Sequence, residues 1–218
     1  MIRKILFTLS FSALCVSLFA ENPHKSTNMG GEVDVYIEYS PIQEITLFVG
    51  EELSLSNFLI PNSNLFDYSL TSIGVTYTPH RNISLTAAYD FQYAFGNEIT
   101  HTAKLMITPE VSFGDFTLSL CERFEMNYSM SEQTPAWLLR SKLQLDYSIP
   151  ETPLTPYLYI EMYNPLEANP PHWYETLAYG AGLDWDISEH HTIGIYYEFS
   201  HSIDSYYHLL GVAYTLGL

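Results

Sequence analysis

The histidines and serines are the residues of this sequence that could do covalent chemistry, because together they can form a hydrolytic site. An enzyme acting on membrane lipid would need a serine hydrogen-bonded to a histidine on one face, with a third group orienting the histidine. His101 lies in a stretch of alternating residues, and its phase places it beside Phe95 and Tyr128 on the apolar face. The nearby Ser129 has the opposite phase. We therefore expect an interfacial histidine, no catalytic residues and no enzyme; a lipid-modifying enzyme is a remote alternative.

Other histidines could bind a metal ion, but their spacing does not favour it. His190 and His191 are adjacent in a predicted turn, so their side chains diverge. His201, Asp204 and His208 gather around a predicted loop in which nothing fixes the geometry that a metal requires. Solvated loop side chains are the favoured interpretation. No glycine-rich loop that could hold a phosphate is evident either, so we expect neither a metal site nor a cofactor.

Charge is unevenly distributed in the sequence, which has 8 Lys and Arg residues, 25 Asp and Glu residues and a formal net charge of −17. Nucleic acid is therefore not an expected partner, because phosphate backbones attract basic surfaces. Four of the eight basic residues share the polar phase of three successive alternating stretches. Cations this close would repel one another, so we expect carboxylates between or opposite them. The expected charge network consists of Lys104, Arg123, Arg140, Lys142, Glu52, Asp90, Glu125, Asp146, Glu161 and Glu198.

The first twenty residues have the pattern of a secretory signal peptide. A positively charged start precedes an apolar stretch, and Ser17 and Ala20 place small residues at the cleavage positions. Removal of this segment would leave Cys121 as the single cysteine, so no internal disulfide is expected. No later segment approaches the run of about 18 apolar residues that a transmembrane helix needs. We divide the chain into a signal peptide at 1–20, an N-terminal tail at 21–31 and a β-barrel at 32–218.

Alternation of apolar and polar residues runs through most of the chain and predicts β-strands, whose successive side chains point to opposite faces. Along 83–95, for example, every odd position is apolar or aromatic. Bacterial barrels prefer an even strand number, so we expect about 10–12 strands, with either a short extra strand in 24–31 or an incomplete span at 32–40. The predicted strands lie at 32–40, 43–55, 69–78, 83–95, 100–113, 116–129, 136–149, 156–163, 176–187, 191–200 and 207–218.

Strands with one apolar face could form a membrane barrel or a soluble β-sandwich. The sequence is 47% hydrophobic and contains 18 Tyr, and transmembrane barrels carry aromatic girdles at both membrane interfaces. On the apolar face, aromatic residues fall near the strand ends. The expected girdle consists of Tyr77, Tyr147, Trp185, Tyr214, Tyr93, Phe95, Tyr128, Trp137 and Phe199. We therefore predict an all-β transmembrane antiparallel up-and-down β-barrel in the outer membrane of a Gram-negative bacterium, with the C-terminus in the periplasm.

Short segments of the C-terminal half carry a second pattern. They are ERFE at 122–125, LRSKL at 139–143, PYLYIE at 156–161, GLDWDI at 182–187 and HLLG at 208–211. Their order and spacing resemble the outer-membrane barrels grouped as Domain of Unknown Function 2490, over roughly residues 70–218. The family's N-terminal tryptophan strand and early arginine are not evident at 32–55. The resemblance implies a barrel in the outer membrane and no particular chemistry.

The sequence leaves the role of this barrel open between two hypotheses. The leading one is a closed structural or adhesive barrel whose lumen charges are paired internally. The alternative is a narrow cation-preferring channel for ions or small solutes, since acidic residues are in excess. The expected partners are outer-membrane lipid, lipopolysaccharide and the barrel-assembly machinery, which would contact the C-terminal strand.

Overall fold

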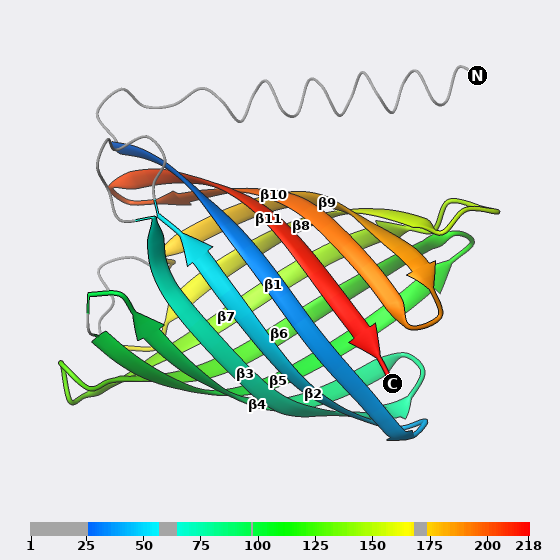
Figure 1. Ribbon diagram of the computed structural model, residues 1–218, viewed down its shortest axis with the longest axis horizontal. Helices are drawn as coiled ribbons and strands as arrows, with labels where there is room; N and C mark the ends of the chain where they lie inside the picture. Colours follow the sequence, from blue (N-terminus) through cyan, green and yellow to red (C-terminus); the bar gives the residue numbers. More distant parts are fainter. Residues whose placement is uncertain (1–25, 57–64, 97, 168–173) are drawn as a thin grey trace.

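Long tilted strands make up the structure, a computed structural model that describes residues 26–56, 65–96, 98–167 and 174–218 (Figure 1). The predicted signal peptide lies outside the described residues. Within the described ranges, no helix is long and apolar enough to cross a membrane. The strands are β1 (Ser26–Ile42), β2 (Ile45–Leu55), β3 (Phe66–His80), β4 (Ile83–Ala94), β5 (Glu98–Phe113), β6 (Phe116–Ser129), β7 (Pro135–Tyr147), β8 (Leu154–Pro165), β9 (Thr176–Ser188), β10 (His191–Ser202) and β11 (Ser205–Gly217).

The strands close into one barrel in which each strand pairs with its neighbours in the chain. These pairs are antiparallel, whereas β1 and β11 pair in parallel, from Ser26 opposite Ser205 to Glu38 opposite Gly217. Figure 1 shows these two strands side by side and running in the same direction. Closure leaves no open sheet edge, which lipid would not tolerate because it cannot hydrogen-bond a free backbone. The predicted all-β, up-and-down barrel is therefore confirmed.

The expectation of an even strand number is wrong, because the barrel closes with eleven strands among the described residues. Neither of the two expected alternatives at the N-terminus holds. The described part of 24–31, residues 26–31, forms no separate strand, and 32–40 is not an incomplete span, because both belong to the 17-residue β1. Residues 26–31, predicted as tail, are thus part of the barrel. Successive antiparallel strands alternate in direction. The first and last strands therefore run in the same direction, and pair in parallel, only when the number of strands is odd.

Four two-residue connections lie at one end of the barrel, which we call the turn end, and a fifth, at 203–204, lies at the opposite end. The four at the turn end are 43–44, 81–82, 114–115 and 189–190. Gly114 has a φ of 63°, a left-handed conformation that glycine adopts readily in two-residue turns. One strand end differs from the prediction, since β7 stops at Tyr147 and 148–153 form a wider turn. We call the opposite end, where β1 and β11 begin, the loop end.

The two faces of the barrel invert the pattern of a soluble protein. On the outer face, Leu105 is 62% exposed and Ile195 is 53% exposed. Inside, Asp90 and Glu161 are only 2% and 3% exposed. A soluble β-sandwich would bury its large apolar side chains and expose its carboxylates. An apolar exterior around a polar interior is the arrangement of a barrel that faces lipid.

The predicted aromatic girdle is mostly on the outer surface. Its exposed members are Tyr77, Tyr93, Phe95, Tyr128, Trp137 and Trp185. Tyr147 is half-buried against Phe116, and the hydroxyl of Tyr214 hydrogen-bonds Nδ1 of His191 at 2.6 Å. Phe199 departs from the prediction. It has the outward phase but is only 5% exposed, because rings of the neighbouring β11, Tyr206 and His208, pack against it.

Aromatic rings on the inner face lie over glycines of adjacent strands. The ring of Tyr159 in β8 lies over Gly180 in β9, where an added Cβ would be 2.0 Å from Cζ of the tyrosine. Tyr157 covers Gly182, and Tyr196 covers Gly211, in the same way. The glycines at 180 and 182 therefore make room for tyrosine rings.

Gly180→Ala should destabilise the barrel by about 1–3 kcal/mol, the usual cost of overpacking a well-filled site. The new methyl group would displace the Tyr159 ring, whose hydroxyl donates to Glu198 at 2.6 Å. Urea titrations of the refolded protein, read by tryptophan fluorescence, measure the change. Gly217→Ala is the matched control, because an added Cβ there has no atom within 4 Å. Equal stability of the two variants would contradict this packing.

Candidate functional site

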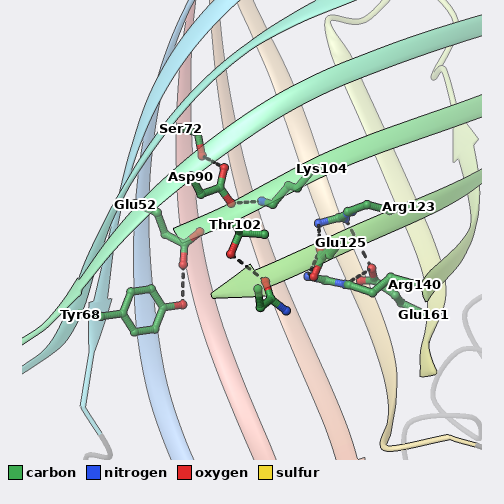
Figure 2. Close-up of polar contacts among 11 residues, drawn as sticks. Glu52, Tyr68, Ser72, Asp90, Thr102, Lys104, Arg123, Glu125, Arg140 and Glu161 are labelled. Carbon is green, nitrogen blue, oxygen red and sulfur yellow. Dashed lines mark hydrogen bonds and ion pairs between the residues drawn. The ribbon is translucent and has the colours of Figure 1, made fainter. Parts of the chain in front are cut away.

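The strands that carry the basic residues are neighbours, so their inward side chains form one wall of the lumen. Lys104 comes from β5, Arg123 from β6, and Arg140 and Lys142 from β7. Figure 2 shows that Lys104, Arg123 and Arg140 each meet a carboxylate on the same or an adjacent strand. We call this surface, built from β4 to β8, the paired wall.

Lys104 and Asp90 form the first unit of the paired wall. The lysine Nζ makes an ion pair with Oδ2 of Asp90 across β4 and β5. The hydroxyl of Ser72 donates to Oδ1 of the same carboxylate at 2.8 Å. Both carboxylate oxygens thus have a partner, which explains how Asp90 can be 2% exposed without an unpaired charge.

Two arginines and two glutamates form the second unit. Nε of Arg140 donates to Oε1 of Glu161 at 2.9 Å, and Nη2 of Arg123 lies 3.5 Å from the same oxygen. Oε1 of Glu125 lies 3.4 Å from Arg140 Nη1 and 3.5 Å from Arg123 Nη1. Each carboxylate therefore lies between two guanidinium groups, which relieves the repulsion between the arginines.

Tyrosine side chains also contact two basic residues of the paired wall, Arg140 and Lys142. Arg140 donates to the hydroxyl of Tyr163 at 2.7 Å, and its guanidinium carbon is 4.1 Å from the centre of that ring. Nζ of Lys142 lies 4.0 Å from the centre of the Tyr159 ring, a cation–π contact. These contacts hold long, flexible cations against the barrel wall.

The opposite side of the lumen carries carboxylates and no matching cation. Glu32 and Asp34 of β1 lie beside Glu52 of β2, and one carboxylate oxygen from each lies within 4.8 Å of the other two. Tyrosine hydroxyls are their partners: Tyr196 donates to Glu32 and, at 2.8 Å, to Asp34. In the described part of the chain, every ion pair lies on the paired wall instead. We call these three residues the acidic triad.

The structure thus brings together only part of the predicted charge network. Asp90, Glu125 and Glu161 contact the basic residues. The other three acids have uncharged partners: Glu52 accepts from Tyr68 at 2.5 Å, Glu198 from Tyr159 and Asp146 from Gln144 at 2.8 Å. The prediction omitted Glu32, Asp34 and Tyr36, although Val33, Val35 and Ile37 alternate with them and mark them as inward-facing.

Two cavities in the lumen share a set of lining residues near its middle. The larger, of about 960 Å³, extends to the loop end, where Asp67, Thr100 and Tyr207 line it. The smaller, of about 400 Å³, extends to the turn end past Thr76 and Thr215. Both are lined by the same central residues, which we call the constriction. Its members are Tyr36, Ser72, Asp90, Lys104 and Arg123.

The histidines that could have formed a hydrolytic or metal site have other partners. His101 lies on the outer face, where its Nδ1 hydrogen-bonds the hydroxyl of Tyr89 at 2.5 Å. His208 hydrogen-bonds Tyr197 at 2.6 Å, and His201 stacks on Tyr206. The hydrogen bond to tyrosine satisfies one ring nitrogen of His101 and one of His208 without water, which favours a position that faces lipid.

Comparisons with solved structures identify the same architecture. The chain is similar to the NanC porin, with a TM-score of 0.53 at 9% identity over 79% of this chain and 81% of that one. The KdgM porin gives a TM-score of 0.47 at 11% identity, covering 76% and 81% of the two chains. A bacterial polysaccharide outer membrane secretin gives 0.49 at 8% identity, covering 78% and 62%.

At these identities the likeness shows the fold alone, which is that of a small porin and is consistent with the outer membrane. No curated protein matches the chain. A protein family, in contrast, matches residues 57–204 directly. The match starts before the motifs at 122–211 and includes all but the last of them. Because it covers more than half of the sequence, the chain belongs to the family described as "Protein of unknown function (DUF2490)".

Proposed function

We propose that this protein is a narrow channel of the outer membrane that passes small ions and small polar solutes and prefers cations. The observation that carries the proposal is the pair of cavities that open toward opposite ends of the lumen and share the residues of the constriction. Polar side chains line both, so water can fill them. The fold it shares with a porin supports the same function.

The preference for cations follows from the distribution of charge. Lys104, Arg123 and Arg140 of the paired wall are neutralised by carboxylates beside them, so they contribute little field to the lumen, and Lys142 is the basic residue of this wall that forms no such ion pair. The larger cavity is also lined by carboxylates that form no ion pair within the described ranges and accept hydrogen bonds from tyrosines instead. They belong to Glu32, Glu52 and Glu198. A pore with surplus carboxylates attracts cations and repels anions.

A closed barrel with a structural or adhesive role is the second candidate. It is favoured by the constriction, where the Lys104–Asp90 ion pair, Arg123 and Tyr36 line the same section of the lumen. A barrel of this size can be filled by its own side chains. The difference between the two functions therefore depends on whether the constriction leaves a continuous water path.

Planar-bilayer recordings of the refolded mature protein distinguish the candidates. We expect stepwise conductance and, in a KCl gradient, a reversal potential with the sign of a cation-preferring pore. The double substitution Asp90→Ser with Lys104→Ser shortens two side chains of the constriction and should raise the single-channel conductance. Leu143→Ala, on the outer face, is the control and should leave conductance unchanged. A silent bilayer containing correctly folded protein would overturn the channel and support the closed barrel.

A further inference from the structure

The acidic triad lies at a special place in the barrel. Glu32 and Asp34 belong to β1, the strand that closes the barrel by pairing in parallel with β11. Glu52 lies opposite Asp34 in the register of β1 and β2. Tyr196 contacts the triad from β10, on the far side of β11, so its hydroxyl connects β10 with β1 across the closing pair of strands. Any group bound here would link three strands around the closure.

Three carboxylates this close need compensation, either by bound protons or by a cation. With one oxygen from each carboxylate inside a 4.8 Å group, the three would repel strongly in the low dielectric of a protein interior. Among the described residues, no lysine or arginine forms an ion pair with them. The tyrosine hydroxyls donate hydrogen bonds but bring no positive charge.

An orphaned carboxylate oxygen of the triad provides independent evidence for a missing ligand. Asp34 is only 7% exposed, and its Oδ1 is buried with no hydrogen-bond partner, while Oδ2 accepts from Tyr196. A buried carboxylate oxygen without a partner costs free energy, and folded proteins rarely leave one. The other two members of the triad, Glu32 and Glu52, line the larger cavity, so an ion could reach the group from the lumen.

We propose that Glu32, Asp34 and Glu52 bind a divalent cation, of which Ca²⁺ fits best. The available ligands are carboxylate oxygens with phenol oxygens nearby, and no imidazole or thiol belongs to the group. Hard oxygen ligands of this kind select Ca²⁺ or Mg²⁺ over zinc and copper. Ca²⁺ accepts irregular geometry and bidentate carboxylates, whereas Mg²⁺ demands a near-ideal octahedron. Water from the cavity would complete the coordination.

The bound ion would stabilise the closure of the barrel at the β1–β11 pair. Parallel strand pairs are slightly less stable per residue than antiparallel ones, and β1–β11 is the parallel pair of this barrel. An ion held by β1 and β2, with Tyr196 of β10 attached to the same carboxylates, would stabilise the closed form by binding it and not the unfolded chain. This role does not depend on whether the lumen conducts.

Two probes test the site on the refolded, detergent-solubilised mature protein. Tb³⁺ replaces Ca²⁺ on oxygen ligands, and Tyr196 and Tyr68 lie close enough to sensitise its luminescence. We expect a luminescence signal that Ca²⁺ abolishes by competition, with a Kd for Ca²⁺ of about 0.1–1 mM. Thermal unfolding should shift to higher temperature with Ca²⁺ and return to its starting value with EDTA.

Asp34→Asn and Glu52→Gln give the sharper result, because each removes one charge and keeps the shape of the side chain. Each should weaken Ca²⁺ and Tb³⁺ binding about tenfold or more. In EDTA each should unfold at the same temperature as the wild type or a higher one, since repulsion within the triad is reduced. Asp146→Asn is the control, because this lumen carboxylate lies outside the triad, and it should keep the full Ca²⁺ shift.

Three outcomes would overturn the proposal. The first is a melting temperature that neither Ca²⁺ nor EDTA changes, which would leave protons as the compensating charge. The second is Tb³⁺ luminescence that survives both triad substitutions. The third is an equal loss of stability in the triad variants with and without Ca²⁺, as a merely structural hydrogen-bond role would give. None of these results would affect the bilayer test of the channel.

Discussion

Glu161→Ala should lower the free energy of unfolding by about 3–5 kcal/mol, the cost of breaking a buried ion pair by removing one partner. Glu161 is 3% exposed and accepts from Arg140 at 2.9 Å, with Arg123 3.5 Å from the same oxygen. Without it, Glu125 would be the one carboxylate that forms ion pairs with both arginines, and their mutual repulsion would be only partly compensated. Urea titration of the barrel in lipid vesicles measures the change.

Asp146→Ala is the matched control for this effect. Asp146 is also a lumen carboxylate, but its partner is the uncharged amide of Gln144, so its loss leaves no buried cation unpaired. We expect a much smaller change, well below that of Glu161→Ala. The double variant Arg140→Ala with Glu161→Ala should cost less than the sum of the two single variants, because the pair is lost together. Additive costs would show that the two side chains do not interact.

The strands could be predicted closely from the sequence because a lipid-facing strand obeys one strict rule. Each outward position must be apolar, so a one-residue error in phase would place charges in lipid. The rule located ten of the strands to within a few residues and gave the inward phase of Lys104, Arg123 and Arg140. Their strands are consecutive, so the chain order alone predicted that these three residues lie close together.

The closure of the barrel could not be predicted in the same way. Whether β1 pairs with β11 in parallel depends on the total number of strands, and no local pattern encodes that number. From the sequence, 26–31 belong to a predicted tail, and 32–40 could span the membrane either fully or incompletely. Glu32 and Asp34 lie within the predicted strand but are not included in the predicted charge network, although Val33 and Val35 are 44% and 42% exposed on the outer face and give the phase.

Some polar residues also break the outward rule, and only the structure shows how they are tolerated. Glu51 and Glu122 have the outward phase. The hydroxyl of Thr71 donates to Glu51 at 2.7 Å, and that of Ser141 donates to Glu122 at 2.7 Å. These cross-strand hydrogen bonds satisfy carboxylates that lipid could not. They arise from register between strands, which alternation within one strand does not specify.

Ile195→Arg should lower the free energy of unfolding by about 2–4 kcal/mol, as for other arginines placed near the bilayer midplane of a barrel. Ile195 is 53% exposed on the outer face of β10. Its partners across the sheet are Leu183 on β9 and Val212 on β11, so no carboxylate lies opposite the new charge. The arginine would have to leave lipid by bending toward an interface or by thinning the bilayer. Urea titration in vesicles is again the measurement.

Thr192→Arg on the same strand separates the effect of lipid from that of the substitution itself. Thr192 faces the lumen, and its hydroxyl donates to Asp186 at 2.7 Å. An arginine there would have water and a carboxylate within reach, so it should cost far less than at position 195. Similar costs for the two variants would mean that the outer face of β10 is not in lipid, and the assignment of inward and outward faces would then be wrong for this strand.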